Sequence, residues 1–316
     1  MVTKIVRVGS AAAAAAGAIL ATGAFALVPA SSAPTARSVS DARTTSATRG
    51  IAGAGAASAA RSTASAGHVL PGQPMMPAGR AGRQSAAAVS GTLAVTRSFN
   101  WAGYATTKGG RSFGLVQATF FVPHLNCAVT PRTYSAHWVG LDGFSKTSDS
   151  VEQDGIEADC AGSTGRTPRY RAWYEMFPKP EAVSTMRVRP GDSITASVSY
   201  SPASRKFRLT VADNTNGRRF SVAKACAARR CPHTSTEVIS EAPSNSKNQL
   251  LPLADYGAVG FTNIAITDGA GHRGGLISRL WQTAKILQYG AASRRLIAEP
   301  TATHASGFAN YWLGEN

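Results

Sequence analysis

The stretch GDSITASVSYS, residues 191–201, decides the fold class. Its apolar residues alternate with Ser and Thr, and they are Ile194, Ala196, Val198 and Tyr200. Successive side chains of a strand point to opposite faces, so this segment has one apolar and one polar face. The run KFRLTV at 206–211 repeats the pattern, and a turn signal follows at 214–217. The two runs therefore predict neighbouring strands with one buried face.

Other parts of the domain have the same period, including LVQATFFV at 115–122 and AVGFTNIAIT at 258–267. In the first of these, Leu115 and Phe121 add apolar bulk to the second face, so we expect that strand to be buried on both sides. Many short strands separated by Gly and Pro predict an antiparallel sandwich or barrel. One segment conflicts, because the apolar residues of 276–288 have helical spacing.

The chain has 316 residues, and its N-terminal part differs from the rest. Lys4 and Arg7 precede an alanine-rich apolar run and then small residues, which predicts a secretory signal peptide over residues 1–33. Residues 34–95 have few large apolar side chains and are expected to form a disordered pro-segment or linker. Aromatic residues begin at Phe99, so residues 96–316 form the predicted folded domain.

The chain is basic, with 33 Lys+Arg against 17 Asp+Glu. A high net positive charge can indicate nucleic-acid binding. No nucleic-acid-binding motif accompanies the charge, and no aromatic residues lie among the basic clusters. A soluble basic secreted protein without a nucleic-acid partner is the favoured interpretation.

Four cysteines in an exported chain favour disulfides. Three pairings can be drawn, and one of them joins Cys226 to Cys231 and leaves Cys127 for Cys160. A zinc site using Cys226, Cys231 and His233 is a weaker alternative, because a second ligand pair at zinc-site spacing is missing. We therefore expect no metal.

The usual nucleophile and metal-protease signatures do not occur in the sequence. Instead, several strand-like stretches combine aromatic bulk with a carboxylate or an amide. They are FNWAGY at 99–104, HWVGLDG at 137–143, SVEQDGIEADC at 150–160, RAWYEMFP at 171–178 and TEVISEAP at 236–243. In the last stretch Glu237 and Glu241 are four residues apart, so they share one face of a strand.

The ordered series NWAG, WVGLDG, Gln-x-Gly, AWYEMFP, Glu-x-x-x-Glu-x-Pro and LADYGAVGFTN resembles the glutamic peptidases, or eqolisins. The resemblance runs from about Ser98 to Asn316. It implies an antiparallel β-sandwich of two bent seven-stranded sheets, of concanavalin-like or jelly-roll type. It also implies strands rather than a helix across 276–289, and we follow the resemblance there.

The resemblance further implies a catalytic pair, one Gln and one Glu. These roles fall on Gln153 and on Glu241, the residue that closes the Glu-x-x-x-Glu motif. Accessory positions that line the substrate site fall on Trp101, Trp138, Asp142, Glu157, Trp173, Glu175 and Glu237.

The chemistry implied by this pair is hydrolysis of a peptide bond. A carboxylate can take a proton from the attacking water, and a neutral carboxamide can stabilise the oxyanion. We therefore expect a secreted, monomeric acid endopeptidase made as a zymogen. It would act on polypeptides without cofactor or metal, and without stable membrane association. The alternative is a non-catalytic, lectin-like sandwich in which Trp101, Trp138 and Trp173 stack on sugar rings.

Overall fold

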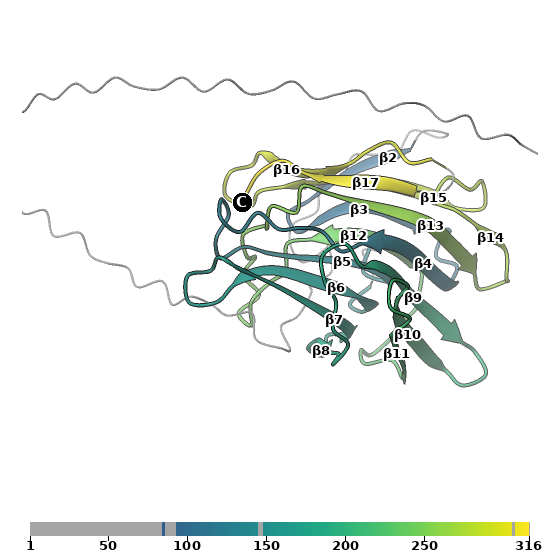
Figure 1. Ribbon diagram of the computed structural model, residues 1–316. Helices are drawn as coiled ribbons and strands as arrows, with labels where there is room; N and C mark the ends of the chain where they lie inside the picture. The colour runs from purple at the N-terminus through teal and green to yellow at the C-terminus, as the bar shows by residue number, and fades with distance from the viewer. Residues whose placement is uncertain (1–83, 86–92, 145–147, 305–306, 316) are drawn as a thin grey trace, which may run out of the picture. The chain divides into compact units, whose positions relative to one another are not determined.

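The computed structural model describes residues 84–85, 93–144, 148–304 and 307–315 (Figure 1). Every regular element in these ranges is a β-strand, which confirms the all-β prediction. No helix of the described part is long and apolar enough to cross a membrane. The predicted signal peptide and nearly all of the predicted linker lie outside the described residues, so the domain boundaries stay predictions.

Seven strands of the described chain form what we call the first sheet. In spatial order they are β2 (Ala94–Ser98), β15 (Gln282–Tyr289), β3 (Trp101–Thr107), β12 (Ser235–Glu241), β5 (Tyr134–Leu141), β6 (Val151–Ala161) and β7 (Thr167–Phe177). All neighbours in this sheet are antiparallel except β2 and β15, which run parallel. Two-residue strands extend its edges, β1 (Gln84–Ser85) beside β2 and β8 (Ala182–Val183) beside β7.

Seven further strands of the described chain form the second sheet. In spatial order they are β16 (Leu296–Pro300), β17 (Gly307–Trp312), β13 (Ala258–Asp268), β4 (Phe113–Phe121), β9 (Ser193–Ser201), β10 (Lys206–Asp213) and β11 (Arg219–Lys224). The two-residue strand β14 (Arg273–Gly274) pairs with β13. The two sheets are joined in one hydrogen-bonded network where β15 pairs briefly with β16. This arrangement is the predicted sandwich.

The main core lies between the two sheets. Val139 and Ile156 of the first sheet pack in one cluster with Val116, Val198 and Leu209 of the second. The alternation in 194–200 and 206–211 has the predicted result, because Ile194, Ala196 and Val198 are buried and the Ser and Thr residues between them are only partly buried. The apolar period of these strands therefore fixes which face meets the opposite sheet.

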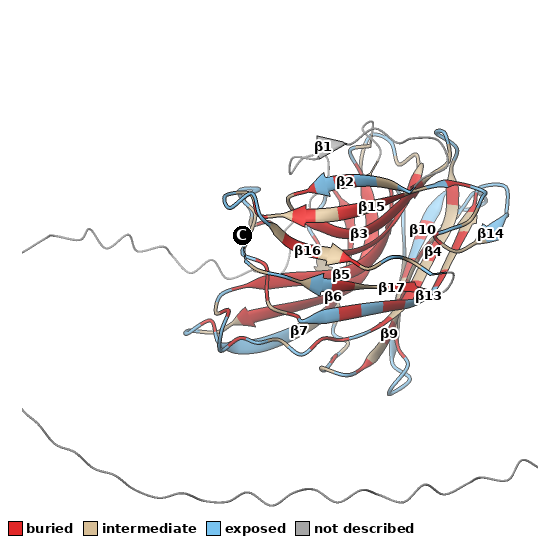
Figure 2. Ribbon diagram, turned by 90° about the horizontal axis from the view of Figure 1, so that it is seen from above, coloured by how far each residue is buried: buried red, intermediate tan, exposed pale blue. Residues whose placement is uncertain are grey.

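The centre of the first sheet is buried on both faces. Every residue of β5, and every residue of β6 except the last, is buried (Figure 2). A second apolar cluster occupies the face that points away from the main core. This outer face of the first sheet contains most of the candidate site residues.

The expectation that β4 is buried on both sides is corrected. Val116, Ala118 and Phe120 are buried, whereas Phe121 on the other face is 65% exposed. β4 belongs to the second sheet, whose outer side carries no further layer of described residues. The apolar side chains on its second face are therefore surface residues, and they do not indicate a second core.

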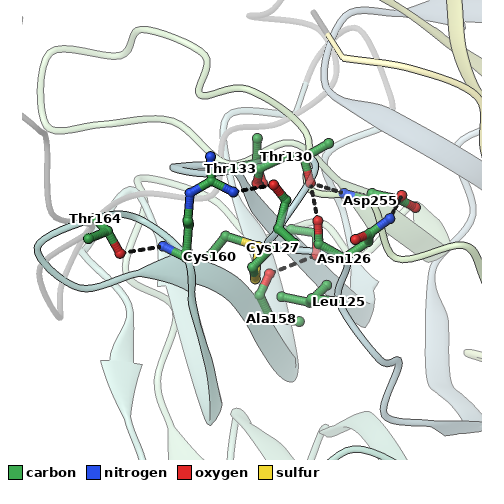
Figure 3. Close-up of a disulfide and its surroundings, with 12 residues drawn as sticks. Leu125, Asn126, Cys127, Thr130, Thr133, Ala158, Cys160, Thr164 and Asp255 are labelled. Carbon is green, nitrogen blue, oxygen red and sulfur yellow. Dashed lines mark hydrogen bonds between the residues drawn. A yellow bond between two sulfur atoms is a disulfide. The ribbon is translucent and has the colours of Figure 1, made fainter. Parts of the chain in front are cut away.

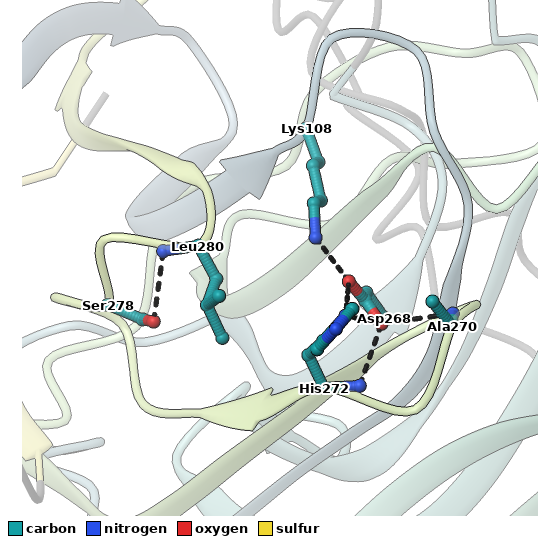
Figure 4. Close-up of polar contacts among 6 residues, drawn as sticks. All are labelled: Lys108, Asp268, Ala270, His272, Ser278 and Leu280. Atoms are coloured by element: carbon teal, nitrogen blue, oxygen red, sulfur yellow. Dashed lines mark hydrogen bonds and ion pairs between the residues drawn. The ribbon is translucent and has the colours of Figure 1, made fainter.

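The helical spacing in 276–288 did not produce a helix. Residues 282–289 form β15, which hydrogen-bonds to β2 on one side and β3 on the other. Ser278 Oγ accepts a hydrogen bond from Leu280 N in the preceding turn (Figure 4). Nearby, the Asp268 carboxylate accepts hydrogen bonds from Ala270 N and His272 N and is paired with Lys108, which fixes the turn between β13 and β14. The strand that the resemblance implied is confirmed.

Two disulfides join the four cysteines, Cys127 to Cys160 and Cys226 to Cys231. The first ties the loop before β5 to the end of β6 (Figure 3). Cys160 N also donates a hydrogen bond of 2.8 Å to Thr133 O, which reinforces this attachment. The pairing of Cys226 with Cys231 leaves neither sulfur free as a thiolate, so the zinc alternative is excluded.

Candidate active site

The outer face of the first sheet is built from alternate residues of its central strands. In β12, Val238 points into the main core, whereas Ile239 belongs to the outer cluster. Glu237 and Glu241 therefore point outward together, as the i, i+4 spacing predicted. The outer cluster consists of Trp101, Ala105, Ala136, Trp138, Val151, Trp173, Phe177, Ile239 and Ile286.

The strand register places a series of outward positions side by side, and we call this series the central row. Its members, from β3 to β7, are Ala105, Glu237, Gly140, Gln153 and Glu175. Glu237 and Gln153 both pair with Gly140, one from each side. The register thus places a carboxylate and a carboxamide on opposite sides of a residue that has no side chain.

Gly140 lets the neighbouring side chains pack closely over its strand. A Cβ built on Gly140 would lie 2.9 Å from Trp138 Cζ3 and 3.3 Å from Gln153 Cβ. Two strand spacings separate the Cα atoms of Glu237 and Gln153 by about 10 Å. Side chains of this length can reach toward each other from both sides of Gly140.

Gln153 is oriented by its other neighbour in the row. Its Nε2 donates a 2.6 Å hydrogen bond to Glu175 Oε2. A carboxylate can only accept, so this bond identifies the nitrogen end of the carboxamide. The Glu175 position, predicted as accessory, therefore supports Gln153 directly.

Glu241 lies in a different row. Its neighbours across the sheet are Trp101 on β3 and Ala136 on β5, and Ala136 pairs in turn with Glu157. Four residues along a strand amount to about 13 Å, and Glu241 and Gln153 are also two strand spacings apart, with β5 between them. The expectation that Gln153 and Glu241 face one water molecule is therefore corrected, because the register brings Glu237 to Gln153 instead.

The Glu241 carboxyl is held by two side chains. Asn100 Nδ2 donates to Oε1 at 3.1 Å, and Trp138 Nε1 donates to Oε2 at 2.9 Å. Complete burial raises the pKa of Glu241 to about 8, and these hydrogen bonds oppose that rise.

Glu157 belongs to a charged cluster at the β6–β7 end of the sheet. It forms an ion pair with Arg171, which also contacts Asp159 at 3.3 Å. Glu181 hydrogen-bonds to Glu157, and burial together with the charge of Glu157 raises the pKa of Glu181 to about 10. The carboxyls of Glu157, Asp159 and Glu181 thus surround one guanidinium, that of Arg171. Because one positive charge cannot balance three negative charges, Glu181 is favoured in its protonated form.

Asp142 is not part of the central row. Its carboxylate accepts hydrogen bonds from His233 N at 2.6 Å and from Thr234 N at 2.9 Å, and Ser150 Oγ also donates to it. Burial raises its pKa to about 6. Asp142 therefore anchors the residues that lead into β12, and it acts on the site only through that strand.

The three predicted tryptophans lie around the central row. Trp101 and Trp138 pack edge to face, with ring centroids 5.0 Å apart at 76°. Trp173 on β7 pairs with Gly155 on β6, two residues along the strand from the pair of Glu175 and Gln153. All three are completely buried.

Comparison with known proteins identifies the family. The sequence model of the Peptidase A4 family matches residues 99–299, a span that contains the whole central row. The chain belongs to the Peptidase A4 family. It is therefore a peptidase, and the predicted resemblance to the glutamic peptidases is confirmed.

Solved structures share the fold of this A4-family peptidase. Scytalido-glutamic peptidase, crystallised with a peptide-based transition-state analogue, is 22% identical, with a TM-score of 0.56 over 67% of this chain and 98% of that one. SCP-B, an eqolisin in complex with the tripeptide Ala-Ile-His, is 22% identical, with a TM-score of 0.54 over 68% of this chain and 98% of that one. A search of curated protein sequences gives no match.

Three residues of the candidate site escaped the sequence-based list, namely Asn100, Gly140 and Glu181. Gly140 left a signal, since a glycine inside a strand often marks a close approach of other groups. Asn100 stands beside Trp101 in the quoted NWAG motif, but its bond to Glu241 spans 141 residues. Glu181 precedes the short strand β8, and nothing in its local sequence indicates the contact with Glu157.

Proposed function

We propose that the protein is a secreted acid endopeptidase in which Glu237 and Gln153 act on the scissile peptide bond. The observation that carries this proposal is the central row, where both residues flank Gly140 on the outer face of the first sheet. Glu237 thus takes the role that the sequence comparison had given to Glu241. Polypeptides are the proposed substrates, in keeping with the peptidase family.

Glu237 serves as the general base. Its carboxylate takes a proton from a water molecule above Gly140 as the water oxygen bonds to the carbonyl carbon of the substrate. The protonated Glu237 then gives that proton to the leaving amine when the C–N bond breaks. General acid–base catalysis of this kind contributes about 10²–10⁴-fold to the rate.

Gln153 stabilises the negative charge that forms on the carbonyl oxygen. Gln153 Nε2 donates to Glu175, and a carboxamide nitrogen carries two N–H donors, one of which would donate to the oxyanion when substrate binds. Because the bond to Glu175 fixes the amide before the substrate arrives, little reorganisation is needed at the reaction step. Loss of one such donor typically lowers kcat by about 10²–10³-fold.

Activity at acidic pH fits the charges around the row. Glu181 and Glu241 lie on the same face, and burial raises the pKa of each of them. In acid these carboxyls stay neutral, so a substrate meets fewer like charges, and the departing amine is readily protonated.

Export and maturation complete the proposal. The predicted signal peptide and the two disulfides support an extracellular location. Gln153 and Glu237 are completely buried, so a polypeptide reaches them only after neighbouring groups move. The proposed protein is made as a precursor from which residues 34–95 are removed. Mass spectrometry of the secreted protein should find its N-terminus near residue 96, and an N-terminus retained near residue 34 would contradict this.

The test is hydrolysis of denatured casein at about pH 3–4 by the mature protein. Glu237→Gln keeps the size of the side chain and removes the base, so we expect at least a 100-fold loss. Gln153→Ala should lose a similar factor. Glu299→Gln is the matched control, because that carboxylate is 41% exposed and lies in the second sheet. It should retain full activity.

Two outcomes would overturn the assignment. Activity that survives Glu237→Gln but disappears in Glu241→Gln would return the base to Glu241. A wild-type protein that binds oligosaccharides and leaves casein intact would favour the lectin-like alternative.

A further inference from the structure

Glu241, which the register separates from Gln153, has a different connection to the reaction. We propose that Glu241 is a positioning residue that orients the Trp138 ring against Gly140, the residue that lies between Glu237 and Gln153. The inference rests on the proposed function, and it assigns a role to a carboxyl that the hydrolytic mechanism leaves unused.

Trp138 spans the distance between Glu241 and Gly140. At one end of the ring, Nε1 donates its 2.9 Å hydrogen bond to Glu241 Oε2. At the other end, Cζ3 lies 2.9 Å from the position that a Cβ on Gly140 would occupy. The six-membered ring therefore packs against Gly140 and forms one wall beside the position proposed for the attacking water.

The neighbours of the ring make this bond important for its orientation. Two of them are glycines, Gly140 two residues ahead and Gly155 across the strand pair. Glycines supply no side chain to hold the ring. Ile239, the neighbour on β12, belongs to the same cluster but cannot hydrogen-bond to the ring, so the tilt depends strongly on the hydrogen bond to Glu241 and on the edge-to-face contact with Trp101.

Glu241 is itself held in place. Asn100 Nδ2 donates to its Oε1, and Asn100 Oδ1 accepts a 2.8 Å hydrogen bond from Ser98 Oγ. Ser98 Oγ also accepts from Trp101 N at 3.1 Å. The turn from β2 to β3 thus fixes Glu241, and through it both tryptophans that contact each other. A displacement of about 1 Å near a reacting group can cost about 100-fold in rate, so the position of this wall matters.

The conservative substitution follows from the protonation state. Because burial raises the pKa of Glu241 to about 8, the carboxyl is neutral at acidic pH. Gln keeps the size and one acceptor oxygen for Trp138 Nε1, whereas Leu keeps only the bulk. A positioning role therefore predicts that the Glu241→Gln variant retains its kcat, whereas the Glu241→Leu variant loses part of it.

The experiment is a double-mutant cycle in the mature protein with a fluorogenic peptide at about pH 4. Glu241→Gln should stay within about threefold of the wild-type kcat, and Glu241→Leu should lose about tenfold in kcat with little change in KM. Trp138→Phe removes the indole N–H. In that background Glu241→Leu should have less than a threefold further effect, because the two residues act through one bond.

Tryptophan emission provides a readout that does not depend on catalysis. Glu241→Leu should shift the emission spectrum, and the shift should vanish when the same change is made in the Trp138→Phe background. If the wild-type protein cleaves no peptide, the proposed function fails, while this emission cycle still decides whether Glu241 orients Trp138.

Three results would overturn the inference. Loss of activity in Glu241→Gln as complete as in Glu237→Gln would make Glu241 a base. Additive effects of Glu241→Leu and Trp138→Phe would show that Glu241 does not act through the ring. A lowered Tm with unchanged kcat and emission in Glu241→Leu would leave only a structural role.

Discussion

At the scale of single residues, the site depends on an absent side chain as much as on those present. Gly140 occupies the centre of the row, and any larger residue would fill the space between Glu237 and Gln153. The contacts of a built Cβ with Trp138, Gln153 and Val151, at 2.9, 3.3 and 3.3 Å, leave no room for even a methyl group without displacement. This position is therefore specific to glycine for steric reasons, and its backbone conformation does not require a positive φ.

Gly140→Ala tests this requirement. We expect kcat to fall by about 100-fold, because a small displacement of the reacting groups is costly, and stability to fall by about 1–3 kcal/mol from overpacking. Gly260→Ala is the control, since nothing lies within 4 Å of the Cβ built at that strand position. Steady-state kinetics and urea unfolding measure the two effects. An alanine at 140 that retains wild-type kcat would show that the close packing over Gly140 does not position the reacting groups.

At the scale of secondary-structure elements, β12 has the central position. It lies between β3 and β5 and has one face in each apolar cluster. Its register against β5 decides that Glu237, and not Glu241, meets Gly140. Two disulfides hold the loops that lead into β5 and β12. Cys127–Cys160 closes a loop with a sequence separation of 33, and Cys226–Cys231 closes one with a separation of 5.

The two disulfides should differ in their contribution to stability. A cross-link removes more entropy from the unfolded chain when it closes a longer loop. Replacing Cys127 and Cys160 by Ala should lower the free energy of unfolding by about 3–4 kcal/mol, and replacing Cys226 and Cys231 by about 2 kcal/mol. Urea unfolding of the two double variants measures both values. The reverse order would contradict a loop-entropy origin.

At the scale of the whole described domain, ionisable groups are buried mainly in the first sheet. Burial raises the pKa of most of these carboxyls, namely Asp142, Glu152, Asp154, Glu157, Asp159, Glu181 and Glu241. A raised carboxyl pKa gives stability that is fully present below the unfolded pKa of about 4 and is lost as pH rises through the folded value. His137 acts in the opposite direction, since burial lowers its pKa to about 3 and its contribution is lost as pH falls below about 6.5.

Stability should therefore be greatest in moderately acidic solution. The carboxyls outnumber the two histidines whose pKa burial lowers, His137 and His233, so we expect a maximum Tm near about pH 4–5 and a clear fall by about pH 8. Circular dichroism of the Glu237→Gln variant gives the Tm without self-digestion. A Tm that climbs steadily from about pH 4 to about pH 8 would show that these carboxyls are ionised in the folded protein.

The sequence by itself determined what depends on local period and on the order of motifs. Alternation in residues 191–211 gave the strands and their buried faces, and the spacing of Glu237 and Glu241 put both on one face. The ordered motifs from Asn100 to Asn263 indicated the family and located Gln153 and Glu175. These features follow from side-chain directions within one strand, which a short segment specifies.

Only the tertiary structure decided which glutamate meets Gln153, which side of β4 is exposed, and that residues 282–289 form a strand. Each depends on parts of the chain that are distant in sequence. The glutamate is decided by β5, which lies between β12 and β6. The exposed side of β4 follows because no layer of described residues covers the second sheet, and β15 forms between β2 and β3. A strand's own sequence fixes the face of every side chain, but hydrogen bonds to other strands fix its register. For this reason the sequence could not decide which of the two glutamates on one face lies beside Gly140, and the assembled sheet could.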